Sequence, residues 1–251
     1  VKSPPYSIEI TLNGITQKTY ESITQVPGSF PKVMQAIKIL KEKKLPFILK
    51  ANCLKQNKHE IHKIKAFTAE LFSDLPKNKF RFKYDPMIYP RYNRDTTPTN
   101  YRLSLKEMEE LRKQDPDIWR QYQEGQKCKL PRLKKKRDYL YLCNAWLKQL
   151  FVNPYGYLKF CALSDKFSAD LKTIPFRESF YRIFPQQLLN ERFKTNSKCK
   201  DCRLRPICYH CPARSYLETG NEEGPVEYFC ELAKGTYREM EKSGLLGTRN
   251  M

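Results

Sequence analysis

The sequence predicts an α/β first half built on parallel strands and a second half that is rich in cysteine and poor in long helices. Over residues 1–115, three strand-like segments alternate with two helix-like segments. Eight of the nine cysteines follow residue 127, and four of them fall between Cys199 and Cys211. These observations separate a layered α/β region from an α+β region whose clustered cysteines we expect to bind metal.

The first strand is predicted over Ser7–Leu12, where β-branched residues alternate and the turn dipeptide Asn13-Gly14 follows. A helix is predicted to begin at Gly28-Ser29, with Ser29 as its N-cap. Its expected end is the basic run Lys41–Lys44, which suits the negative end of the helix dipole.

A second strand is predicted over Pro46–Ala51, followed by a helix that starts at Asn57 and runs through Phe72. Asn57 and Glu60 have the spacing of a capping box. A third strand is predicted over Phe80–Ile88. Connections of this length imply parallel pairing, so the three strands and their helices suggest half of a barrel.

A further capping box, Ser104 with Glu107, predicts a helix that reaches about Gln114. A basic connector is predicted over residues 116–140, and a closing helix over Glu227–Lys242. Between these two segments, turn residues and cysteines dominate the sequence.

The chain is strongly basic, since 47 lysines and arginines against 27 aspartates and glutamates give a formal charge of +20. The densest stretch, residues 127–137 (KCKLPRLKKKR), would suit a phosphate backbone or serve as a solvated connector. No nucleic-acid-binding motif accompanies it, so nucleic acid is not the expected partner. A basic surface also attracts acidic proteins.

Composition and the first residues set the expected compartment. Hydrophobic residues make up 40% of the chain and aromatic residues 13%, which is enough for a folded core. No apolar run approaches the roughly 20 residues that span a bilayer. The first residues, VKSPPY, have no apolar stretch of the signal-peptide kind. We therefore expect a cytoplasmic protein that does not enter the membrane.

Four of the cysteines form two CxxC pairs, Cys199 with Cys202 and Cys208 with Cys211, five residues apart. Four-cysteine zinc sites usually separate such pairs by about a dozen residues or more. Tight cysteine runs are more typical of cubane iron–sulfur clusters, whose larger core spreads its ligands. A disulfide scaffold fits poorly, because the cysteine count is odd and nothing indicates export.

Other cysteines stand at defined distances from these pairs. Cys143 and Cys161 bracket Asn153-Pro-Tyr-Gly156, a turn that predicts a β-hairpin, and Cys230 begins the closing helix. The whole pattern reads C-x12-G-x4-C, a gap, C-x2-C-x5-C-x2-C, a gap, and C. With the segments NPYGYLKFC, CKDCRLRPICYHCPA and YFCELAK, it resembles the seven-cysteine signature of the SPASM extension of radical S-adenosylmethionine (radical SAM) maturases.

The first half resembles the same family. The segments SIEITLNG, TYESITQVPGSFPKVMQAIKIL and LKANCLKQNKHEI are similar to the fourth to sixth strands, with their helices, of the radical SAM partial barrel. The resemblance implies the C-terminal half of that barrel over 1–115, the basic connector over 116–140, and a SPASM-like domain over 141–251. It also implies that Thr11 contacts S-adenosylmethionine, because relatives often have a serine near the cofactor there.

The resemblance further implies two auxiliary [4Fe–4S] clusters. One cluster would be bound by a set that we call the cysteine quartet: Cys199, Cys202, Cys208 and Cys230. The other would be bound by the cysteine trio: Cys143, Cys161 and Cys211. Its fourth ligand would be Cys128, or that iron would stay open to substrate. Cys53, after the second strand, is expected to be a structural thiol.

The sequence departs from the family in one way that bears on activity. The C-x3-C-x2-C motif, which in the family binds the cluster that cleaves S-adenosylmethionine, occurs nowhere in it. Either the chain is the rear part of a longer enzyme or the protein has lost that chemistry, and the missing half of a barrel favours the first alternative. In both cases we expect the chain alone not to cleave S-adenosylmethionine. That cofactor and a third [4Fe–4S] cluster are expected only in the intact enzyme, where a 5′-deoxyadenosyl radical would take a hydrogen atom from substrate.

Two functional hypotheses remain. By resemblance, the intact protein would be an oxidoreductase that modifies a peptide or protein, with a flavodoxin- or ferredoxin-like electron donor, and the auxiliary clusters would transfer electrons or bind substrate. The alternative is a non-catalytic, zinc-binding cysteine-rich module that binds RNA or an acidic protein. That alternative explains the charge and the CxxC pairs but not the family spacing of Cys143, Gly156, Cys161 and Cys230.

Overall fold

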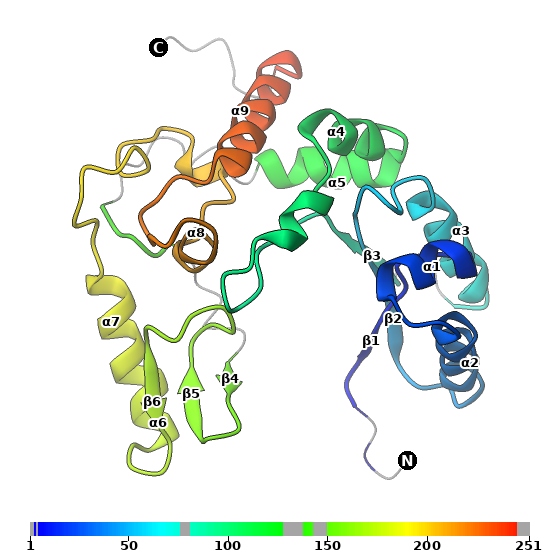
Figure 1. Cartoon of the computed structure of the whole chain (residues 1–251), viewed down its shortest axis with the longest axis horizontal. Coiled ribbons are helices and arrows are strands. Elements are labelled where there is room, and N and C mark those ends of the chain that lie inside the picture. Colours follow the sequence, from blue (N-terminus) through cyan, green and yellow to red (C-terminus); the bar gives the residue numbers. More distant parts are fainter. Residues whose placement is uncertain (1–2, 4, 76–80, 128–137, 143–149, 245–251) are drawn as a thin grey trace. The chain divides into compact units, whose positions relative to one another are not determined.

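The structure is a computed structural model that describes residues 3, 5–75, 81–127, 138–142 and 150–244 (Figure 1). The chain divides into two compact units. Unit 1 comprises residues 1–88 and 98–119, and unit 2 comprises residues 89–97 and 120–251.

Unit 1 is built on a parallel sheet in the order β1-β2-β3. The strands are β1 (Ile8–Thr11), β2 (Phe47–Asn52) and β3 (Phe82–Asp85). Ile10 pairs with Leu49, which pairs in turn with Phe82. The three predicted strands and their parallel pairing are therefore confirmed.

Three helices lie on one side of this sheet: α1 (Gln17–Thr24), α2 (Ser29–Glu42) and α3 (Ile61–Leu71) (Figure 1). Side chains that alternate along β2 point into the core beneath them, with Phe47, Leu49 and Ala51 buried. Ile37 of α2 and Ile64 of α3 are buried as well. The helix predicted after Gly28 is confirmed, although Gly28 itself is the N-cap and Ser29 is the first helical residue.

The predicted start of α3 at Asn57 is wrong, because the helix begins at Ile61 with Glu60 as its cap. Asn57 instead holds a turn, accepting a hydrogen bond from the Leu54 backbone N–H at 2.9 Å. Its side-chain amide donates to the backbone carbonyls of Asn13 and Asn52, at 2.8 Å each. Asn57 thus ties together the loops that follow β1 and β2.

Glu60 does not close a capping box on α3 but anchors α1, which was not predicted. Its buried carboxylate, on a residue that is 3% exposed, accepts hydrogen bonds from the backbone N–H groups of Ile15 and Thr16 at 2.7 and 3.3 Å. The hydroxyls of Thr16 and Thr19 donate to it at 2.7 and 2.8 Å. Burial alone raises the pKa of this carboxyl, but these hydrogen bonds together outweigh burial and lower it.

We expect Glu60→Gln to lower the free energy of unfolding of unit 1 by about 2 kcal/mol, because charge-assisted hydrogen bonds are lost. The lowered pKa means that the ionised Glu60 stabilises the fold fully above about pH 4.5, and that this contribution is lost as the pH falls further. Urea unfolding between pH 3 and pH 7 measures both effects. Glu70→Gln, at an exposed position of α3, is the control. Equal losses in the two variants would contradict the anchor.

Helix α4 (Leu105–Lys113) has the predicted capping box, with Ser104 and Glu107 bonded in both directions. A second helix, α5 (Pro116–Lys127), corrects the prediction of a connector from residue 116. Pro116 suits a first helical turn, and the Asp115 carboxylate accepts a hydrogen bond from the Asp117 backbone N–H at 3.1 Å. The remainder of the basic stretch, residues 128–137, lies outside the described residues.

Unit 2 contains an antiparallel sheet of β4 (Phe151–Val152), β5 (Tyr157–Lys159) and β6 (Ser168–Asp170). The predicted hairpin at Asn153–Gly156 is confirmed, and Gly156 adopts the left-handed φ of 86° that its turn requires. The predicted closing helix is also confirmed as α9 (Glu227–Lys242).

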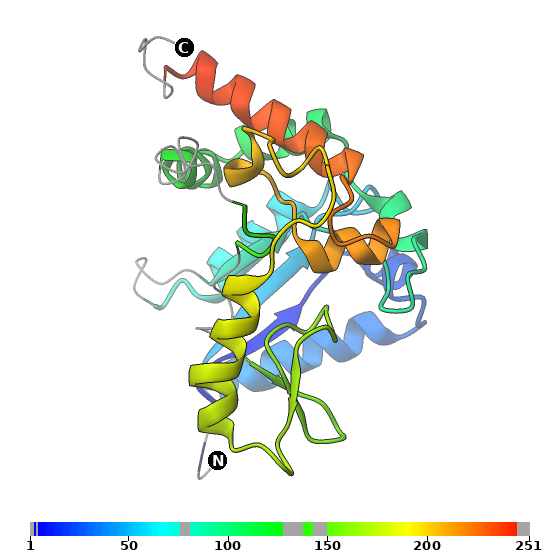
Figure 2. The same cartoon turned by 90° about the vertical axis from the view of Figure 1, so that its left-hand side faces the viewer.

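Helices within the cysteine-rich region were not predicted. Helix α6 (Phe176–Glu178) continues through a π-helical turn (Ser179–Ile183) into α7 (Phe184–Asn190), which runs beside the hairpin in both views (Figure 1, Figure 2). Helix α8 (Pro212–Thr219) follows the CxxC pairs. The core of unit 2 is aromatic and aliphatic, and its buried members include Tyr141, Leu158, Phe160, Phe167, Phe184 and Leu188.

No helix in the described parts of the chain combines the length and the apolar character that crossing a membrane requires.

Candidate functional site

The cysteine quartet gathers in unit 2 from two segments far apart in the sequence. Cys202 and Cys208 flank the short 3₁₀ helix η5 (Arg205–Ile207), which packs against α9. The Cys208 thiol lies 3.6 Å from the Phe229 carbonyl, next to Cys230 in the first turn of α9. The fold therefore carries Cys230 to the first three cysteines of the quartet.

The thiols of the quartet affect one another's pKa. Burial raises the pKa of Cys208 to about 12, and the thiols of Cys230, Cys199 and Cys202 act in the same direction. Burial also raises the pKa of Cys199, with Cys230 and Cys202 again acting in that direction. Four thiolates held this close repel one another, and a positively charged metal core would offset that repulsion.

The chemistry of its donor atoms bears on which metal group the quartet could hold. Within the described residues, no three His, Cys, Asp or Glu side chains form a group that could hold one metal ion. A cubane cluster makes a different demand, because each thiolate binds a different iron of an extended core. The donor set of the quartet, four thiols and no carboxylate or imidazole, suits iron–sulfur ligation.

Two members of the cysteine trio are described. Cys161 follows β5, and its sulfur accepts a hydrogen bond from the Leu163 backbone N–H at 3.4 Å. Cys211 is the N-cap residue of α8. The buried Tyr141 is linked to both positions. Its ring packs edge-on against Phe160, the residue before Cys161. The pKa of its phenol is raised mainly by burial, then by Glu222, and to a smaller extent by the Cys211 thiol. Cys143 and Cys128 lie outside the described residues.

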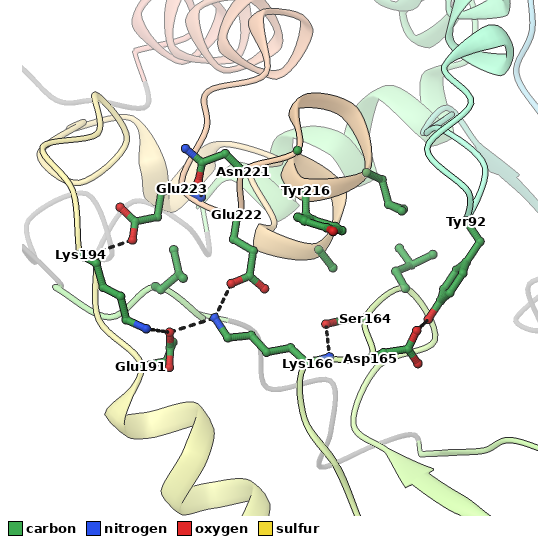
Figure 3. A pocket seen from close by; sticks show the side chains of 15 residues that line it. Tyr92, Ser164, Asp165, Lys166, Glu191, Lys194, Tyr216, Asn221, Glu222 and Glu223 are labelled. Atoms are coloured by element: carbon green, nitrogen blue, oxygen red, sulfur yellow. Dashed lines mark hydrogen bonds and ion pairs between the residues drawn. The ribbon is translucent and has the colours of Figure 1, made fainter. Parts of the chain in front are cut away.

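A pocket of about 650 Å³ opens in unit 2 (Figure 3). Leu163 and Ser164, which follow Cys161, form part of its wall, and so does Ala213, which follows Cys211. Tyr92 and Tyr216 line the pocket and are both about half exposed. Its size and mixed lining are those of a small-ligand or side-chain site.

Lys166 is the central charge of this pocket (Figure 3). Its ammonium group pairs with Glu191 at 2.9 Å and with Glu222, whose other oxygen accepts a hydrogen bond from Tyr141 at 2.6 Å. Burial lowers the pKa of Lys166, but the two glutamates together raise it, so the amine stays protonated at neutral pH. Among the lining residues, carboxylates outnumber ammonium groups by four to two, with Asp165, Glu191, Glu222 and Glu223 against Lys166 and Lys194.

In unit 1, the sheet face that is not covered by α1–α3 is polar. Thr11 is exposed at the carboxyl end of β1, in register with Lys50. Lys50 lies 3.6 Å from both Glu9 and Asp85 and so links β1 to β3. A parallel sheet usually buries both faces, so a polar face of this kind is suited to lining a ligand site.

Cys53 belongs to unit 1, whereas both cysteine sets belong to unit 2. It is fully buried after β2, its backbone N–H donates to the Asp85 carbonyl at 2.9 Å, and burial raises the pKa of its thiol strongly. An inert structural role is consistent with this environment.

Sequence reasoning missed two residues that contact the candidate site. Arg205 is buried between the two CxxC pairs, where its charge acts on Cys199, Cys208 and Cys202. His210 lies between Cys208 and Cys211, and burial followed by the charge of Arg205 lowers its pKa to about 4, so its imidazole is neutral. Their positions in the sequence, between the two CxxC pairs for Arg205 and within the second pair for His210, were the signal that could have identified them.

No protein-family model matches the chain. Among curated proteins, it is similar to the AdoMet-dependent heme synthase of Methanosarcina barkeri (strain Fusaro / DSM 804), with 23% identity over 234 residues. That alignment covers 87% of this chain and 66% of the relative.

Solved structures of anSMEcpe resemble the chain in fold. The hexahistidine-tagged form with bound AdoMet gives a TM-score of 0.56 at 16% identity, covering 95% of this chain and 65% of that one. The native form with bound AdoMet and Cp18Cys peptide gives 0.57 at 15% identity, with 95% and 68% covered. The chain thus spans about two thirds of the length of these proteins and shares their α/β fold with a parallel sheet.

Proposed function

We propose that this chain is a radical SAM/SPASM protein and that it belongs to an enzyme that modifies a peptide or protein by radical chemistry starting from S-adenosylmethionine. In this proposal, unit 1 is part of the radical SAM partial barrel, and the cysteine-rich unit 2 is a SPASM domain with two auxiliary [4Fe–4S] clusters. The observation that carries it is the cysteine quartet, which the fold assembles from two segments.

The quartet is proposed to hold one cluster. Cys199 would bind from the inside, where burial keeps water from its sulfur, while Cys208 and Cys230 are half-buried and Cys202 is exposed. When bound, such a cluster supplies one-electron transfer. The chain itself positions two of the ligands through η5. The Arg205 backbone N–H donates to the Cys202 carbonyl at 3.1 Å, and the Cys208 backbone N–H donates to the Arg205 carbonyl at 3.2 Å.

The trio is proposed to hold the other cluster, through Cys161, Cys211 and Cys143, with Cys128 as the proposed fourth ligand. Support comes from the pocket, because its wall includes residues that closely follow Cys161 and Cys211. A substrate side chain held there would lie next to the redox group that receives its electron. We propose that Thr11, on the polar sheet face, contacts S-adenosylmethionine in the intact enzyme.

An acidic electron donor of the flavodoxin or ferredoxin type is the proposed redox partner. The formal charge of +20 would speed its encounter with this chain, and the acceleration would fall with rising ionic strength.

A second candidate substrate class follows from the curated relative, which is named as a heme synthase. On that alternative, the pocket and the neighbouring cysteines would serve a haem-type molecule. Asp165 also pairs with Lys159 at 2.6 Å, so the four lining carboxylates exceed the three ammonium groups by one negative charge. This surplus disfavours the acidic side groups of such a molecule and favours a peptide with a basic residue.

Binding to the reconstituted protein distinguishes these candidates. We expect fluorescently labelled Cp18Cys peptide to raise its anisotropy saturably, and Tyr216→Ala to weaken that binding about tenfold, because Tyr216 lines the pocket. Tyr181→Ala, at a more exposed tyrosine outside the pocket lining, is the matched control. Binding of hemin with no peptide binding would favour the second candidate, and binding of neither would remove both substrate assignments.

A further inference from the structure

We propose that Arg205 is the buried cation that sets the reduction potential of the cluster bound by the cysteine quartet. This inference rests on the proposed function, since it requires a cluster at the quartet. Arg205 is not a ligand, and its proposed role is electrostatic.

The backbone fixes Arg205 with respect to two ligands. It begins η5 three residues after Cys202 and three residues before Cys208. Its N–H donates to the Cys202 carbonyl at 3.1 Å, and its carbonyl accepts from the Cys208 N–H at 3.2 Å. Any group bound by these two cysteines therefore has the Cα of Arg205 at a constant position beside it.

The side chain is held as firmly as the backbone. Arg205 is 7% exposed, and its guanidinium donates through one nitrogen to the carbonyls of Tyr139 and Leu140, the latter at 2.7 Å. The guanidinium also lies 4.5 Å from the Phe193 ring centroid. Carbonyls and an aromatic ring are neutral partners, so they orient the charge without cancelling it. These contacts hold the guanidinium in one orientation, whereas a lysine side chain at this position would be more flexible.

The charge acts on the ligands themselves. Arg205 is hydrogen-bonded through its backbone to both Cys202 and Cys208, so its buried positive charge belongs to the segment that carries these ligands. Reduction adds one negative charge to a cluster, and a fixed cation in a poorly solvated site stabilises the reduced form. Arg205 should therefore raise the reduction potential.

The test is a redox titration of the anaerobically reconstituted chain, followed by EPR, on three variants. Arg205→Gln removes the charge, and Arg205→Lys keeps it. Arg203→Gln is the matched control, since Arg203 follows Cys202 directly but is exposed, with its guanidinium 5.2 Å from the Tyr237 ring centroid. We expect Arg205→Gln to shift the potential of one cluster clearly downward, Arg205→Lys to stay near the parent, and Arg203→Gln to shift it less because water screens its charge.

The outcomes separate this proposal from the one beneath it. A parent chain that binds no iron would overturn the proposed function. A parent with normal clusters whose potential is the same in Arg205→Gln would overturn the role of Arg205 alone, as would equal shifts in the glutamine and lysine variants. If Arg205→Gln loses iron, the test rests on Arg205→Lys, which keeps the positive charge. A reduction potential of Arg205→Lys far from that of the parent would then contradict a charge effect.

Discussion

Replacing Cys202 with alanine is expected to lower the iron content of the reconstituted protein from about eight to about four atoms per chain. Cys202 is a member of the quartet, so one cluster loses a ligand while the trio keeps its own. Because Cys202 is exposed, its removal leaves no cavity in the core. Iron and acid-labile sulfide, measured together after gel filtration, report the loss.

Cys53→Ala is the matched control for this substitution. It also removes one thiol, but from the core of unit 1, while both cysteine sets belong to unit 2. We expect it to cost stability and to leave about eight iron atoms bound. Equal iron content in Cys202→Ala and the parent would show that Cys202 is not a ligand.

Removal of the iron by chelation is expected to unfold part of unit 2 while the sheet of unit 1 stays intact. In the described chain between Phe193 and Cys211, the regular structure consists of η5, three residues long. The other backbone hydrogen bonds there are local turns, such as Lys200 N–H to the Ser197 carbonyl at 3.0 Å. A segment with so few regular bonds depends on its ligands to stay folded.

Hydrogen–deuterium exchange measures this effect peptide by peptide. We expect exchange over residues 194–211 to accelerate at least about tenfold on iron removal, because metal-binding energy is folding energy for such segments. Strands β1–β3 provide the internal control, since their ladder contains none of the proposed ligands. Glu223 accepts hydrogen bonds from the backbone N–H groups of Lys194 and Thr195. Unchanged exchange over 194–211 would mean that these bonds and the local turns keep the segment folded without iron.

The sequence predicted the elements whose signals are local. Alternating β-branched residues located β1, the Ser104–Glu107 pair located α4, and the Asn-Pro-Tyr-Gly turn located the hairpin of unit 2. The parallel pairing followed from the length of the connections between strands.

What was missed depends on contacts between distant residues. Helix α1 is short and polar, and its first turn is held by Glu60, about 41 to 45 residues further along the chain. The position of Arg205 is set by carbonyls 65 and 66 residues away. The spacing of the cysteines predicted a set of ligands, but the sequence could not show which cation would lie beside them.

Iron, acid-labile sulfide and zinc per chain, measured on protein purified and reconstituted without oxygen, test the central claim most directly. The account predicts about eight iron and eight sulfide per chain, with zinc near zero. One or two zinc ions with no sulfide would contradict it and favour a zinc-stabilised binding module instead.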